Sequence, residues 1–314
     1  MRSIAIINQK GGAGKTTTAV NLSDALAREG RRVLLVDLDP QSHASLHLGV
    51  QLGEDEAGVY DVLVGDAAAA EAMRSVNERL ALLPAGIDLV GAELELRQRP
   101  NWQRVLRDVL APYREAFDFC IIDCPPSLGQ LTLAALVAVE EVIIPLQPHF
   151  LALQGLGRLL ETVTLVRQDL NPALRVSGVA LCMFEKGTRL AQEVLEDIQR
   201  FLSAAEPGTA WCGARVFDTR VRRNIKLAEC PSYGQTIFAY ASGSNGAEDY
   251  HALALEVLGL ANGARHEISG DGQAITESIA EGVAAAEARG RVEEPDAVVG
   301  STSIVAGRAK SDGI

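Results

Sequence analysis

The sequence has few aromatic residues, few cysteines and no long apolar run. Aromatic side chains make up 4% of the 314 residues, and the two tryptophans, Trp102 and Trp211, are too far apart in sequence to indicate a base-stacking platform. The five cysteines are an odd number and include no C-x-x-C pair, which argues against a disulfide framework or a zinc site. No stretch approaches the roughly 18 uninterrupted apolar residues of a membrane span, and the N-terminus lacks the apolar region of a signal peptide. We therefore expect a soluble, intracellular protein.

Positive charge is scarce as well. The formal net charge is −12, which argues mildly against nucleic acid as a partner, although local patches decide binding. Hydrophobic residues, at 47%, and charged residues, at 22%, are in an ordinary globular balance. The length allows one large domain or two small ones.

Apolar strand-like runs alternate with helical patterns through most of the chain. The expected strands cover residues 3–8, 32–39, 80–85, 117–126, 140–148, 175–184 and 214–217, and the clearest helices cover 16–29 and 101–116. Continuously apolar strands separated by helices predict an α/β fold with a mostly parallel, twisted sheet and helices on both faces. Ligands of such sheets bind at the carboxyl ends of the strands. The loops at 9–15, 39–45 and 124–130 fall there.

The composition changes after about Asn262. We expect a folded domain over residues 1–262 and a flexible, acidic, partly helical tail over 263–314. The tail has nine acidic and five basic residues. Within it Ile275, Ile279 and Val283 are spaced four apart, which predicts a weak helix.

Residues 8–17, NQKGGAGKTT, form a glycine-rich loop between a predicted strand and a predicted helix. The phosphate-binding pattern is G-x-x-x-x-G-K-[ST], and here Gln9 takes the place of its first glycine while Lys10 adds a cation. Such a loop points backbone N–H groups at phosphate oxygens, and the helix N-terminus adds its positive dipole. The sequence therefore predicts a P-loop NTPase-like fold that binds ATP phosphates. The predicted phosphate contacts are Lys10, Gly11, Gly12, Ala13, Gly14, Lys15, Thr16 and Thr17.

Three aspartates end predicted strands near this loop. Asp37 and Asp39 end the second strand, and Asp123 ends the strand 117–126. With the Thr16 hydroxyl, Asp37 and Asp123 are the predicted Mg²⁺ ligands, because P-loop proteins use such oxygens for the ion. Lys15 is expected to reach the β- and γ-phosphates. Asp39 is our candidate for positioning the attacking water.

Four segments carry a family resemblance: KGGAGKTTTAVNL, RVLLVDLDPQ, DFCIIDCPPSLGQLTLAAL and IIPLQPHFLALQGLGRLLETV. They closely resemble the ParA-type deviant-Walker ATPases of the ParA/MinD superfamily, and the similarity runs from Arg2 to about Gly259. The chain looks like the short form without an N-terminal helix-turn-helix domain. The resemblance implies ATP and Mg²⁺ as cofactors, a homodimer that sandwiches the nucleotides, a Lys10 that reaches the partner's phosphates, and an Asp39 linked to hydrolysis.

A lysine that acts across the dimer has a plain electrostatic rationale. ATP brings about four negative charges to each site, and two facing sites would repel each other. A cation given by each protomer to the other's phosphates favours dimerisation only when nucleotide is bound. It would also stabilise the charge of the transition state. We therefore predict catalytic roles for Lys10 and Lys15 together with Asp39.

A basic cluster lies within residues 214–235, ARVFDTRVRRNIKLAECPSYGQ, in a chain that is otherwise net negative. In ParA-like proteins the matching R-N-x-[RK]-L-x-E-x-P-S-x-G segment supplies cations for sequence-independent DNA contact, which several cations on one face can provide. One departure is Gly187, which stands where relatives often have an arginine, so we expect a weaker or shifted DNA surface. The predicted DNA-binding residues are Arg215, Arg220, Arg222, Arg223 and Lys226.

Alternative functions remain open. A MinD-like membrane ATPase would need a basic amphipathic tail helix, whereas Glu277 and Glu281 lie in the tail and would be repelled by an anionic bilayer. A metabolic P-loop enzyme, either an iron–sulfur reductase or a carboxylate-activating ligase, would need exposed cysteines or a substrate pocket motif. Cys124 near the end of a strand is the one cysteine in a suitable place. His43 and His47 have the i,i+4 spacing of metal ligands, but no third ligand follows.

The preferred interpretation is an ATP-driven switch. ATP closes a sandwich dimer, the dimer binds nonspecific double-stranded DNA, and slow Mg²⁺-dependent hydrolysis to ADP and phosphate resets it. The resemblance implies a ParB-like or other cargo adaptor that stimulates hydrolysis, action in the cytoplasm at the nucleoid, and no membrane partner. Plasmids, chromosome origins, protein clusters and microcompartments all fit as cargo.

Overall fold

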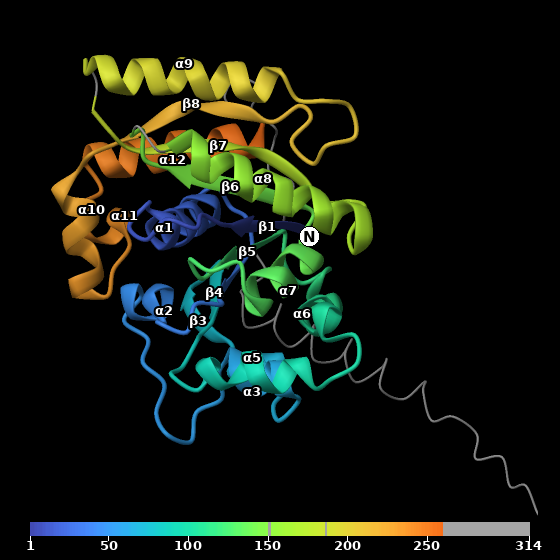
Figure 1. Cartoon of the computed structure of the whole chain (residues 1–314). Coiled ribbons are helices and arrows are strands. Elements are labelled where there is room, and N and C mark those ends of the chain that lie inside the picture. The colour runs from blue at the N-terminus through green and yellow to red at the C-terminus, as the bar shows by residue number, and fades with distance from the viewer. Residues whose placement is uncertain (150–151, 186, 260–314) are drawn as a thin grey trace, which may run out of the picture.

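Eight strands form a single, mostly parallel sheet in the computed structural model, which describes residues 1–149, 152–185 and 187–259 (Figure 1). The strand order is β3-β4-β2-β5-β1-β6-β7-β8, and β3 with β4 is the antiparallel pair. The predicted α/β fold is confirmed. The strands are β1 (Arg2–Ile6), β2 (Val33–Asp37), β3 (Arg74–Asn77), β4 (Leu80–Leu83), β5 (Phe119–Asp123), β6 (Glu141–Leu146), β7 (Arg175–Phe184) and β8 (Arg215–Arg222).

Helices cover both faces of the sheet, and each face has its own apolar core. The first face carries α1 (Lys15–Arg28), α2 (His43–His47), α10 (Ile225–Glu229), α11 (Ile237–Tyr240), α12 (Asn245–Leu258) and the 3-10 turn η3 (Cys230–Tyr233). The second face carries α3 (Val59–Val64), α4 (Ala69–Ala72), α5 (Leu89–Arg97), α6 (Val105–Leu110), α7 (Gln130–Ala138), α8 (Ala152–Asp169), α9 (Arg189–Ser203) and the 3-10 turns η1 (Trp102–Arg104) and η2 (Ala111–Tyr113).

The two cores explain why the strands are continuously apolar. Side chains alternate between the faces of a strand, so Ile4 and Ile6 of β1 enter one core while Ala5 and Ile7 enter the other. All four are at most 1% exposed. A strand in this position has no polar face.

Three local expectations need correction. The strand expected at 214–217 continues to Arg222, which places Arg220 and Arg222 inside β8. The single helix expected over 101–116 is divided into η1, α6 and η2, and Pro112 within η2 removes a backbone N–H donor. The edge strand β3 has the polar sequence RSVN, so no apolar run in the sequence indicates a strand there.

The outer edge of β8 is covered by side chains of α12. Glu256 accepts the backbone N–H groups of Asp218, at 2.8 Å, and Thr219. Asp249 accepts the backbone N–H of Arg222 at 2.8 Å. These carboxylates accept hydrogen bonds from backbone N–H groups that would otherwise be free to pair with a ninth strand.

The tail lies outside the described residues, and so do its predicted weak helix and the boundary at 262. Across the part of the chain that the structure describes, no helix is both long and apolar enough to cross a lipid bilayer.

Candidate nucleotide-binding site

The glycine-rich loop connects β1 to α1 and opens onto empty space. Gly12 and Gly14 adopt φ of 73° and 92°, a left-handed region that glycine favours. A Cβ on Gly11 or Gly12 would have no described atom within 4 Å, whereas a Cβ on Gly14 would contact Cys182 of β7 at 3.4 Å. The loop is therefore packed on one side and open on the other, as a cradle for an anion requires.

Asn8 fixes the start of this loop. Its Nδ2 donates to the Pro145 carbonyl of β6 at 2.6 Å, and its Oδ1 accepts from the Lys10 backbone N–H at 2.9 Å. No sequence pattern predicts this role for Asn8. The side chain ties the loop to the neighbouring strand.

A cleft of about 480 Å³ lies over the loop and the start of α1. Lys15 is the first residue of α1 and is only 7% exposed. No described residue forms an ion pair with Lys15. A buried ammonium without an ion pair beside open backbone N–H groups suits a phosphate. The cleft is lined by Gly11, Gly12, Gly14, Lys15, Thr16, Thr17, Asp39, Gln41, His43, Leu46, His47, Pro126 and Pro231.

Asp37 and Asp123 lie side by side at the carboxyl edge of the sheet, as register partners on β2 and β5. Both are 0% exposed. Neither oxygen of Asp123 has a hydrogen-bond partner among the described residues. Burial raises the pKa of Asp123 well above its ordinary value and Asp37 raises it further, while the nearby Thr16 hydroxyl and the Lys15 charge lower it only in part.

Asp37 is buried as deeply but is hydrogen-bonded. Burial raises its pKa to about 6, although hydrogen bonds from Ser45 and Asp39 oppose the shift. Asp39 itself is 6% exposed, lines the same cleft as Lys15, and accepts the Gln41 backbone N–H at 3.0 Å. The structure thus brings the predicted metal carboxylates and the predicted water-positioning residue to one edge.

The donor set fits Mg²⁺. The Thr16 hydroxyl and the Asp37 and Asp123 carboxylates are hard oxygen ligands, which this ion prefers, and it usually keeps several waters. An uncompensated buried carboxylate is costly, so a divalent cation beside Asp123 would offset that cost. Among the described residues no group of three or more His, Cys, Asp or Glu side chains suits a metal, which leaves His43 and His47 without a third ligand.

Lys10 lies apart from the Lys15 cleft. It is exposed and lines a separate cavity of about 290 Å³ between the loop and α8, together with Asn8, Gln154 and Arg158. The predicted contact of Lys10 with phosphates of the same chain therefore has no support in this cleft. Its predicted contact with a partner's phosphates stays a prediction.

A second cleft of about 480 Å³ opens on the other side of Gly12 and Gly14. Its lining is largely apolar and includes Cys182, Leu227 and Tyr250. This cleft has no local signal in the sequence, because its lining comes from β7, β8, α10 and α12 as well as the loop. It adjoins the phosphate loop and offers an apolar surface to a ring system.

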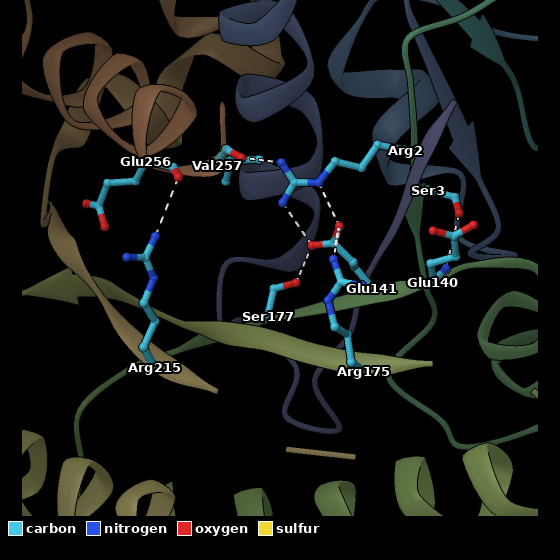
Figure 2. Close-up of polar contacts among 9 residues, drawn as sticks. All are labelled: Arg2, Ser3, Glu140, Glu141, Arg175, Ser177, Arg215, Glu256 and Val257. Atoms are coloured by element: carbon cyan, nitrogen blue, oxygen red, sulfur yellow. Dashed lines mark hydrogen bonds and ion pairs between the residues drawn. The ribbon is translucent and has the colours of Figure 1, made fainter. Parts of the chain in front are cut away.

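The predicted DNA-binding residues do not form one face. Arg215 begins β8 and Arg222 ends it, so roughly 20 Å of strand separates them. Arg215 instead lies with Arg2, Glu141 and Arg175 at the amino edge of the sheet (Figure 2).

Acidic partners offset the charges at the other end of β8. Arg222 pairs with Asp249 at 2.7 Å and with Glu248 at 3.0 Å. Arg223 pairs with Glu185 at 3.0 Å and Lys226 with Glu229 at 2.8 Å. The Arg220 guanidinium donates to backbone carbonyls of its own strand. The exposed fractions of the Arg223 and Lys226 side chains are 77% and 46%, so these two are the best placed to meet a polyanion.

Known proteins resemble this chain over most of its length. The AAA domain family model matches residues 1–176. The chain is 43% identical to the chromosome partitioning protein ParA of Myxococcus xanthus, over 82% of this chain and 88% of that protein. It is 44% identical to the sporulation initiation inhibitor protein Soj of Bacillus subtilis, over 83% and 98% respectively. A solved structure of cobyrinic acid a,c-diamide synthase from Mycobacterium smegmatis, with bound ATP analogue and magnesium, shares 36% identity at a TM-score of 0.70, over 84% and 97%.

The parallel sheet, the glycine-rich loop and the AAA domain match define the class: this is a P-loop protein of the AAA-domain type. Within that class the chain belongs to the ParA/MinD family of ATPases, together with the ParA and Soj proteins. The resemblance seen in the sequence is confirmed.

Proposed function

We propose that this protein is a Mg²⁺-dependent ATPase that acts as a dimerising switch in DNA partition. One observation carries the ATPase part: Asp123 is a buried carboxylate with no hydrogen-bond partner among the described residues, in register with Asp37 at the edge where Lys15 and Thr16 lie. Such a carboxylate suits a bound magnesium ion. ATP supplies the anion for the cradle, and the adjoining apolar cleft takes its base.

Nucleotide binding and phosphate release test the ATPase proposal. Lys15→Ala is expected to lose ATP binding, because a buried phosphate would then lack its cation. Asp39→Ala is expected to bind Mg²⁺-ATP while hydrolysing it at roughly a hundredth of the wild-type rate, as befits a residue that positions water. Arg107→Ala is the control, since the Arg107 side chain is 38% exposed and its ion pair among the described residues is with Asp108. Hydrolysis that survives both substitutions would contradict the proposal.

Lys10 is proposed to act in the partner's site. Its exposed position outside its own cleft supports this role. In an Asp39→Ala background, which should preserve bound ATP, sedimentation velocity is expected to detect a dimer with ATP and a monomer without it. Adding Lys10→Ala should return the ATP-bound protein to a monomer. A dimer that forms equally well without Lys10 would remove the trans role.

The DNA proposal is supported by the relatives, which are named as chromosome partitioning proteins, and by the exposure of Arg223 and Lys226. We propose that the ATP-bound dimer binds nonspecific duplex DNA in the cytoplasm, at the nucleoid, and that a ParB-like or other cargo adaptor stimulates hydrolysis. A gel shift at low salt with ATP should detect the complex. Wild-type protein that ignores DNA with and without ATP would exclude the partition function.

A second candidate function is ATP-dependent activation of a carboxylate. The 36% identity to the cobyrinic acid a,c-diamide synthase structure favours it. The partition function is preferred because several curated relatives that are 40–45% identical carry chromosome partitioning names. An iron–sulfur enzyme has less support, since Cys120 and Cys124 are both fully buried. ATP turnover that requires added carboxylate and ignores DNA would reverse the preference.

A further inference from the structure

Ser45 is a buried residue of α2 that contacts Asp37 twice. It is 1% exposed. Its hydroxyl donates to Asp37 Oδ2 at 2.7 Å, and its backbone N–H donates to the same oxygen at 2.8 Å. A single residue therefore satisfies one oxygen of this carboxylate.

The direction of the Ser45 hydroxyl hydrogen is set by a third contact. The backbone N–H of Ala85, just beyond β4, donates to Ser45 Oγ at 3.0 Å. Because Oγ accepts on that side, its one hydrogen is left for Asp37. Ser45 is a fixed donor rather than a rotating hydroxyl.

The second oxygen of Asp37 is held less firmly. Oδ1 accepts the backbone N–H of Asp39 at the longer distance of 3.2 Å. A carboxylate oxygen can accept two hydrogen bonds, so Oδ1 keeps capacity for a cation. Asp123, the register partner of Asp37, has both of its oxygens available as well.

The far side of α2 is also held. His47 Nε2 lies 3.4 Å from Cys230 Sγ. Gly49, just after α2, approaches Gly234 so closely that a Cβ on Gly234 would lie 2.9 Å from the Gly49 Cα. Since α2 has only five residues, these contacts rather than helix propensity keep it in place. Ser45 therefore projects from a fixed support.

We propose that Ser45 is a positioning residue for the magnesium site, which holds Asp37 with Oδ1 directed to the cation. The inference rests on the proposed Mg²⁺-ATP function and names a residue that shapes its metal site. Partners that orient metal ligands typically change metal affinity about 10- to 100-fold when removed. Removing the hydroxyl should therefore weaken magnesium binding without weakening the phosphate cradle, because the Ser45 hydroxyl bonds to Asp37 and Ala85 and, among the described residues, not to the glycine-rich loop.

Binding of a fluorescent ATP analogue to the full chain separates these two effects. Each variant is titrated with the analogue in EDTA and then with Mg²⁺ at fixed analogue. Ser45→Ala is expected to bind the analogue within about twofold of wild type in EDTA but to need roughly tenfold more Mg²⁺ for half-saturation. Ser45→Thr, which keeps the hydroxyl, should restore most of the Mg²⁺ affinity. Ser45→Val, which matches threonine in size without the hydroxyl, should not.

Ser23→Ala provides the matched control. Ser23 is fully buried in α1, and its hydroxyl donates to the Ala19 carbonyl at 2.7 Å, away from the carboxylates. It should leave the Mg²⁺ requirement unchanged. Equal Mg²⁺ requirements for the threonine and valine variants, or an equal loss of analogue binding with and without Mg²⁺, would overturn the role of Ser45. Wild-type protein that binds no Mg²⁺-nucleotide would instead overturn the proposed function and this inference with it.

Discussion

The two edges of the sheet hold buried carboxylates in opposite ways. At the amino edge Glu141 is 2% exposed and accepts hydrogen bonds from Arg2, at 2.7 and 2.8 Å, from Arg175 at 2.9 Å, and from Ser177 (Figure 2). At the carboxyl edge Asp123 is equally buried and has no hydrogen-bond partner among the described residues. The Glu141 carboxylate has its hydrogen-bond partners within the chain, whereas the Asp123 carboxylate has none among the described residues.

The difference separates a structural ion pair from a binding site. A buried charge is tolerated when it is paired or bound to a metal. Glu141 connects the first residues of β1 and β7 to β6, so its charge is paired by residues of the fold itself. The Asp123 carboxylate has no such partner among the described residues, so its two oxygens are left for a ligand.

Asp123→Asn should give the largest effect. Loss of a metal carboxylate is expected to reduce Mg²⁺-dependent ATP hydrolysis by roughly 100-fold or more. In the absence of nucleotide the free energy of unfolding should rise by about 1 kcal/mol, because a neutral amide that can donate to Asp37 replaces a buried acid. Phosphate release and urea unfolding measure the two quantities. A less stable variant with normal hydrolysis would contradict the comparison.

Asp37 should make stability depend on pH at the same edge. Its pKa is about 6 in the folded chain against an ordinary 3.8, so the folded state holds the proton more tightly. The stabilising contribution is complete below about pH 4 and is lost as the pH rises through about 6, by about 3 kcal/mol. Urea unfolding of wild type and Asp37→Asn without nucleotide should therefore diverge over this range, with wild type losing more. Parallel curves would show that Asp37 titrates normally.

Glu141→Gln at the amino edge should lower the free energy of unfolding, whereas Asp123→Asn should raise it. The arginine partners are partly exposed, so the loss is expected to be about 2 kcal/mol, less than for a fully buried pair. Burial raises the pKa of Glu141, but Arg2, Ser177 and Arg175 bring it below its ordinary 4.5. Its contribution is present above pH 4.5 and is lost as the pH falls further. Urea unfolding should find the gap between wild type and variant closing in acid, while ATP binding stays normal.

The smallest expected effect concerns DNA. Arg223→Ala should weaken DNA binding about threefold and reduce the salt dependence by about one counterion. Arg215→Ala serves as the matched arginine at the amino edge and should leave the salt dependence unchanged. Gel shifts over a salt series measure both. An equal effect of the two substitutions would show that DNA spans both edges.

The carboxyl edge was predictable because its signals are local in sequence. Lys15, Thr16 and Asp39 line one cleft, and the strand-end residues Asp37 and Asp123 are register partners. The second cleft could not be predicted from the sequence, because Cys182, Leu227 and Tyr250 come from separate elements. The backbone conformation of Met183 could not be predicted either, since its φ of 51° places a non-glycine residue in the left-handed region at that cleft.

The basic cluster shows the main limit of sequence pattern. Counting charges between residues 214 and 235 finds the arginines but not their partners. Glu185 and Asp249 lie outside that segment and offset the charges of Arg223 and Arg222. Glu229 lies inside the segment, one helical turn from Lys226, and offsets the charge of that lysine. Gly187 has a conformational reason to be glycine, since its φ is 92°. Whether a cluster of basic residues forms a positive surface is decided only when the fold has placed the acidic residues near it.

The carboxylates of α12 along β8 have a consequence for crowding in the cell. An edge strand with free N–H groups can recruit a strand from another molecule and start aggregation. Glu256 and Asp249 already occupy the N–H groups of Asp218, Thr219 and Arg222. A second copy therefore finds these three N–H groups already occupied and cannot use them to extend the sheet.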